Sequence, residues 1–127
     1  MTLLDIVLIV KIAVTGLLVG LPMLLLPRAL LLKRLGIEEV AIPYIRLYGL
    51  AIIALLVGYA SAFSGFVGDE FPLGIALMGI VSNGGGFLTM LVTGLATKQR
   101  LLAGFLLVIA TTLAVSVLSP DMFMQAI

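Results

Sequence analysis

Few side chains in this sequence could take part in chemistry, and the most prominent polar group lies in an apolar setting. Asn83 stands in the run Ser82-Asn83-Gly84-Gly85-Gly86, near the middle of an apolar stretch at residues 73–96. A glycine inside a helix costs roughly 1 kcal/mol relative to alanine, and hydrocarbon offers the amide no hydrogen-bond partner. Such a run needs close protein neighbours, which a helix packed inside a membrane bundle has.

Two basic residues also lie inside apolar stretches. We expect Lys11 to snorkel to the near interface and to pair with a carboxylate such as that of Asp5. The alternative is an intramembrane cation that binds an anion or joins a proton path. Arg46 lies about one turn inside the second stretch. It either anchors that helix at the interface, pairing with Glu38 or Glu39, or holds a lipid phosphate, a quinone head or a partner's carboxylate.

The residue types that are missing exclude several chemistries. The sequence has no cysteine and no histidine, which removes thiolate ligands and the commonest ligand of haem and transition metals. Glu38 and Glu39 have no third carboxylate nearby, so a solvated acidic pair is the better interpretation than a metal site. We therefore expect no bound cofactor and no catalysis by this chain alone. A coupled multidrug transporter would need a carboxylate embedded in the membrane. The apolar stretches contain none, which argues against this class of protein.

The composition predicts an all-α membrane protein. Of 127 residues, 63% are hydrophobic and 10% charged, against about 25% charged in a soluble domain. Four apolar stretches, at residues 6–26, 44–66, 73–96 and 101–119, each approach the roughly 20 residues that span a bilayer. We expect four transmembrane helices in one antiparallel bundle, forming a single domain over residues 1–127. A net charge of +1 without a basic stripe argues against a nucleic-acid partner.

Residues 28–35 are predicted to form a short amphipathic helix between the first two spans, with Gly36 as its stop. Its leucines face the membrane interface. Its basic residues, together with one at the start of the second span, are expected to contact anionic lipids or a partner; they are Arg28, Lys33, Arg34 and Arg46.

Small residues recur at helical spacing in three spans, which favours close helix packing. The first span has Gly16 and Gly20 in a G-x-x-x-G pattern. The second and third spans show the same kind of seam, and we expect the two seams to pack against each other or against another copy, with Asn83 bonding across the interface. The seam residues are Ala54, Gly58 and Ser61 in the second span and Gly79, Ser82 and Gly86 in the third.

The basic residues also predict an orientation. Lysine and arginine flank the first and third loops but are missing from the second loop and the C-terminus. Because cytoplasmic loops carry the excess of such residues, we expect both termini to face away from the cytoplasm, in a bacterial inner membrane.

Pro27 after the first span, with Arg46 and Gly49 in an Arg-x-x-Gly setting at the start of the second, resembles the DoxX-like group of small membrane proteins. The resemblance covers mainly the first half of the chain. It implies a four-helix integral membrane protein, and in some members an accessory role in membrane oxidoreductase systems that deliver electrons to quinone. Acidic positions found in the helices of some members have no counterpart in this second span.

The sequence therefore predicts a structural or accessory membrane subunit. It would pack through the small-residue seams against a membrane partner or a second copy, as a homo-oligomer or part of a larger complex, and would hold a lipid or quinone in a groove opened by the glycines. The alternative is an oligomeric pore, or a passive transporter of small solutes, lined by Asn83.

Overall fold

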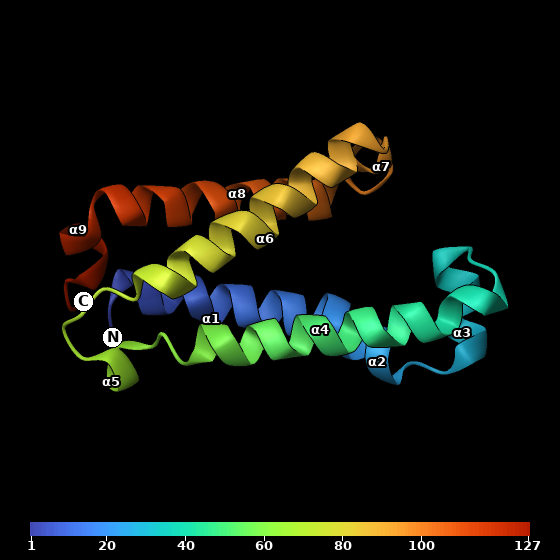
Figure 1. Cartoon of the computed structure of the whole chain (residues 1–127), viewed down its shortest axis with the longest axis horizontal. Helices are drawn as coiled ribbons and strands as arrows, with labels where there is room; N and C mark the ends of the chain where they lie inside the picture. Colours follow the sequence, from blue (N-terminus) through green and yellow to red (C-terminus); the bar gives the residue numbers. More distant parts are fainter. The chain divides into compact units, whose positions relative to one another are not determined.

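Helices make up the structure, a computed structural model that describes residues 1–127 (Figure 1). Four of them are long and apolar enough to cross a membrane, which makes this an integral membrane protein of the all-α class, as predicted. The β-structure consists of one isolated bridge between Thr2 and Ala126. The spanning helices are Leu3–Leu25, Glu39–Ala60, Leu73–Val92 and Arg100–Leu118.

The chain forms two compact units. The first unit is Leu8–Ser61, and the second unit combines Met1–Val7 with Ala62–Ile127. Each unit contains one pair of long helices that pack against each other.

The first spanning helix changes its winding part of the way along. It runs as α1 (Leu3–Thr15), continues as a π-helical segment η1 (Gly16–Gly20), and ends as α2 (Leu21–Leu25). In η1 the N–H of Leu21 donates to the carbonyl of Gly16, five residues back. Pro22 follows at once and has no N–H to donate. The sequence predicts a kink at this proline, and the structure places a π-segment directly before it.

Glycines bring α2 and η1 close to α4 (Ile42–Ala60). A Cβ at Gly20 would lie 2.8 Å from Cδ1 of Ile53, and a Cβ at Gly49 would lie 2.9 Å from the backbone nitrogen of Leu24. The pairs run in opposite directions along the chain, so the two helices are antiparallel. A side chain at Gly49 would push the helices apart because it meets backbone atoms, whereas one at Gly20 would require the Ile53 side chain to move.

A short helix connects the two long ones. It is α3 (Arg28–Leu35), which coincides with the amphipathic segment predicted at residues 28–35. Gly36 ends it in the left-handed region with φ of 60°, where glycine has no steric penalty. The 3₁₀ turn η2 (Glu39–Ala41) then leads into α4.

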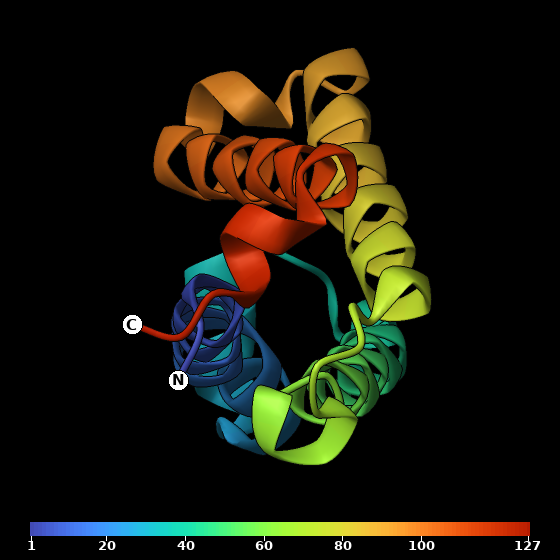
Figure 2. The same cartoon turned by 90° about the vertical axis from the view of Figure 1, so that its left-hand side faces the viewer.

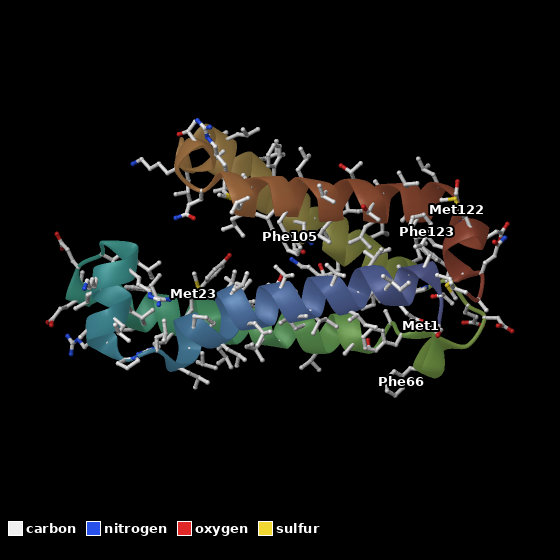
Figure 3. All side chains as sticks on the ribbon, turned by 180° about the vertical axis from the view of Figure 1, so that it is seen from behind. Met1, Met23, Phe66, Phe105, Met122 and Phe123 are labelled. Carbon is white, nitrogen blue, oxygen red and sulfur yellow. The ribbon has the colours of Figure 1, made fainter.

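The second unit is built on α6 (Leu73–Val92) and α8 (Arg100–Leu118), which lie side by side with the short α7 (Leu95–Lys98) at their turn (Figure 1). Its buried side chains include Met90 on α6, Leu113 on α8, and Phe123 on α9 (Pro120–Met124). Figure 3 labels Phe123. Phe66 on α5 (Ser64–Val67) is exposed.

The two ends of the chain meet in the second unit (Figure 2). The N–H of Ile127 donates to the carbonyl of Met1 at 2.9 Å, next to the Thr2–Ala126 bridge. These bonds satisfy backbone groups that would otherwise be left unpaired near the helix ends.

Two of the predicted spans, the second and the third, extend beyond the C-terminal ends of the helices that the structure shows there. The second ends at Ala60, although the apolar stretch continues to residue 66, because the chain turns at residues 61–63 and restarts as α5. The third ends at Val92, and Gly94 adopts a φ of 75°. Hydrophobicity alone does not distinguish these turns from the helix before them.

Replacing Gly49 by alanine should destabilise the first unit, because the added Cβ would meet backbone atoms that cannot move aside. Overpacking of this kind costs about 1–3 kcal/mol, measurable as a lower thermal unfolding midpoint in detergent. Gly104→Ala is the matched control, since Gly104 lies inside α8 with nothing within 4 Å of its Cβ position. Equal midpoints for the two variants would contradict the close approach of α2 and α4.

Candidate functional site

The Arg46 guanidinium binds the end of the first spanning helix. Nη1 donates to the carbonyl of Met23 at 3.1 Å, and Nη2 donates to the carbonyl of Leu26 at 2.6 Å. In a continuing helix, the Met23 carbonyl would accept the N–H of residue 27, but that residue is Pro27, which has none. Arg46 supplies the missing donor from the neighbouring helix.

Arg46 and Gly49 therefore act together. They lie one turn apart on α4, so both reach the same part of α2. Gly49 lets the two backbones approach, and Arg46 closes the open carbonyls at the end of that helix. The Arg-x-x-Gly pattern of the sequence thus has a structural use in this chain.

The other basic residues predicted to contact lipid or a partner lie on or at the start of α3. Arg28 pairs with Glu39 through Nη2 and Oε2 at 2.8 Å, and both side chains are well exposed. An exposed pair of this kind is worth about 1 kcal/mol or less. Lys33 and Arg34 are exposed in the last turn of α3, where positive charge complements the helix dipole.

Asp5 joins the N-terminus to the start of α5, within the second unit. Its Oδ2 accepts hydrogen bonds from the N–H of Thr2 at 2.7 Å and the hydroxyl of Ser64 at 2.6 Å, and its Oδ1 accepts from the N–H of Ser64 at 2.8 Å. The N–H of Asp5 donates to Oγ1 of Thr2, which completes a reciprocal cap at the start of α1. The carboxylate is buried and has a structural role.

Asn83 is buried in α6, with 1% of its surface exposed. Its amide nitrogen donates to the carbonyl of Gly79 at 2.7 Å, and a longer contact of 3.4 Å reaches Oγ of Ser82. The Ser82 hydroxyl also contacts the Gly79 carbonyl, at 3.3 Å. The amide nitrogen is therefore satisfied in part by its own helix.

The three consecutive glycines of α6 face different neighbours. A Cβ at Gly84 would contact Ala110, and a Cβ at Gly86 would lie 3.3 Å from Leu106, both on α8. We predicted Gly86 to pack against the second span or against another copy. In the structure its neighbour is Leu106 on the fourth span, because α6 and α8 form one hairpin. Gly85 has nothing within 4 Å.

The other seam residues divide between buried and exposed positions. Gly16 and Gly20 are buried, with Gly16 facing Leu56 at 3.2 Å. Ala54 and Ser61 are exposed, and the Ser61 hydroxyl donates to the carbonyl of the half-buried Gly58 at 2.6 Å.

The expectation that Lys11 snorkels to the interface is wrong. Lys11 is 6% exposed, and its Nζ lies 6.0 Å from the centre of the Tyr59 ring. The electron-rich face of a tyrosine attracts a cation, more strongly where water is excluded, so the ammonium lies over this ring. Thr15, one turn further along α1, is buried as well. The sequence did not predict the contact between Lys11 and Tyr59, because the two residues are distant in the chain. The position of Tyr59 well inside the second span was a signal that this side chain contacts the protein and not the interface.

Comparisons with protein-family models, with curated proteins and with solved structures found no match.

Replacing Arg46 by methionine should lower the free energy of unfolding by about 2 kcal/mol or more, because two charge-assisted hydrogen bonds are lost. Arg46→Lys should recover part of that loss. Thermal unfolding in neutral and in anionic lipid checks this, with the exposed Arg34→Met as control. If Arg46 instead anchored a lipid phosphate, its replacement would matter only in anionic lipid.

Proposed function

We propose that this chain is a structural or accessory subunit of the membrane, which packs against a membrane helix of a partner or of a second copy. The observation that supports this best is the outer face of α6. Gly85, Thr89 and Thr93 follow each other at four-residue spacing on that face, and all three are exposed.

The polar groups of this face are already satisfied. The Thr89 hydroxyl donates to the carbonyl of Gly85 at 2.8 Å, and the Thr93 hydroxyl donates to the carbonyl of Thr89 at 2.7 Å. What remains toward the surroundings is methyl groups and bare backbone. Because lipid tails are as apolar as leucine, helices associate in membranes by close packing, which small residues allow.

The same face is hollowed. A shallow depression of about 270 Å³ is lined by Leu88, Thr89, Val92 and Thr93, and 88% of the surface of Val92 is exposed. A large side chain from an approaching helix would fill this depression and gain the contacts that lipid tails make less completely.

Two charged groups within the long helices support an accessory role over a catalytic one. Asp5 caps helix starts, and Arg46 closes the end of a helix. Groups bound in this way are not held ready for proton transfer to a substrate. Lipid contact belongs to the same role, through the exposed bases of α3.

We also propose the inner membrane of a bacterium as the location, with both termini on the non-cytoplasmic side. The basic residues flanking the first and third loops support this orientation. The alternative of a passive pore lined by Asn83 has less support, because this side chain is buried and its amide nitrogen donates to its own helix.

Thr89→Leu should disrupt the assembly, because the larger side chain would fill the depression. The matched control is Thr111→Leu on α8, since Thr111 is also exposed and its hydroxyl also donates four residues back at 2.8 Å. Native mass spectrometry after gentle detergent extraction measures the complex. We expect Thr89→Leu to release free chain and Thr111→Leu to leave the complex intact.

The mass of that complex distinguishes the two kinds of partner. A multiple of 13.4 kDa indicates further copies of this chain, and any other mass indicates a different protein. A wild-type chain that is only monomeric would contradict the proposal, and so would equal losses in the two variants.

A further inference from the structure

The short helix α3 joins two spanning helices at one side of the membrane. The first spanning helix ends at Leu25 and the second begins at Glu39, so α3 lies between the point where the chain leaves the apolar layer and the point where it enters again. A helix in that place lies at the level of the lipid headgroups. The lipid phosphates are therefore the groups nearest to its charged side chains.

Contacts within the first unit fix which face of α3 points outward. Leu31 is 2% exposed, and α3 packs against α4, so Leu31 faces the protein and not the membrane interface. At the start of α3, Arg28 is held by its ion pair with Glu39. The rotation of α3 about its axis is therefore set by the protein.

The outward face carries a leucine beside two bases. Lys33 and Arg34 follow Leu30 by three and four residues, which places the three side chains together on one face of the helix. All three are exposed. Lys33 and Arg34 form no ion pair or hydrogen bond within the chain, and α3 contains no acidic residue. An apolar side chain next to bases is typical of a helix that lies at a membrane surface.

The other two bases that the sequence assigns to lipid or a partner already have partners in the structure. Arg46 donates to two carbonyls of the first spanning helix, and Arg28 pairs with Glu39. Lys33 and Arg34 are the two that remain for a ligand from outside the chain.

Anionic phospholipid is the partner whose chemistry matches this face. The Arg34 guanidinium is a planar fork that fits two phosphate oxygens, and the Lys33 ammonium adds a second positive charge. One exposed carboxylate of the same connection, Glu38, offsets only part of that charge. Phosphatidylcholine has a phosphate too, but its headgroup also carries a cation, which the two bases repel.

We propose that Lys33 and Arg34 form a binding site on the outward face of α3 for the headgroup of an anionic phospholipid such as phosphatidylglycerol. This inference deepens the lipid contact of the proposed function, on which it rests, by naming the residues and the lipid class. It does not involve the outer face of α6. A chain that is only monomeric would contradict the subunit role and leave this lipid site intact.

The test is native mass spectrometry of the purified full-length protein in detergent, titrated separately with phosphatidylglycerol and with phosphatidylcholine of the same acyl chains. We expect the wild type to bind phosphatidylglycerol more tightly. Lys33→Gln combined with Arg34→Gln should weaken that binding ~30-fold, since each base near a membrane surface contributes about a factor of five. Binding of phosphatidylcholine should not change.

The matched control is Lys98→Gln combined with Arg100→Gln, which removes two exposed bases outside α3 and should keep the preference for phosphatidylglycerol. The exchange of Lys33→Arg with Arg34→Lys keeps both charges and should retain most of the binding. Circular dichroism establishes that each variant is folded. In the unfolding experiment on Arg46, Arg34→Met should accordingly lower the midpoint in anionic lipid alone.

Equal binding of the two lipids by the wild type would overturn the proposal. Equal losses in the two glutamine variants would overturn it as well, because net charge and not the face of α3 would then attract the lipid. Inorganic phosphate in excess should leave phosphatidylglycerol bound. Displacement by inorganic phosphate would identify a soluble phosphate as the ligand and reject the lipid.

Discussion

Inside hydrocarbon there is no water to take up a hydrogen bond, and the structure depends on this constraint. Backbone polar groups in a membrane must be satisfied by the protein itself. The helix ladder does so everywhere except at its ends and interruptions, and at some of these a charged side chain supplies the missing partner. Asp5 caps the start of α1 and the start of α5. Arg46 donates to the Met23 carbonyl, which lacks a helical donor because Pro27 has no N–H, and to the Leu26 carbonyl at the helix end.

Close approach of backbones is the second requirement, and glycine meets it in each unit. Gly20 and Gly49 let η1 and α2 lie close to α4, and Gly86 does the same for α6 against α8. The glycine run around Asn83 therefore has two faces. One is occupied within its own hairpin, and the other, at Gly85, is open to the surroundings and forms part of the outer face of α6.

Much of the fold could be predicted from composition, because a stretch of about twenty apolar residues with at most one charge has few alternatives to a membrane helix. The short helix ending at Gly36 was also predictable, since a glycine after a basic last turn is a common stop signal. The ends of the second and third helices were not, because their turns lie in sequence that is as apolar as the helices.

The polar contacts were harder to predict than the helices. The structure links Arg46 to carbonyls at Met23 and Leu26, and backbone carbonyls leave no mark in a sequence. Lys11 was expected at the interface because its position along the helix is shallow, but its side chain is buried and lies over Tyr59, a residue of another helix. The π-segment has no distinctive residues of its own, so only the nearby Pro22 indicated an irregularity.

The central claim is that four helices cross the membrane in alternating directions, and single-cysteine labelling tests it most directly because the chain has no cysteine of its own. Cysteines replace Glu38, Asp69, Gln99 and Gln125, all of them exposed, and bacterial spheroplasts are treated with an impermeant maleimide. We expect labelling at positions 69 and 125 in sealed spheroplasts, and at 38 and 99 only after permeabilisation. Labelling of positions 69 and 99 from the same side would mean that α6 does not cross the membrane, and would contradict the claim.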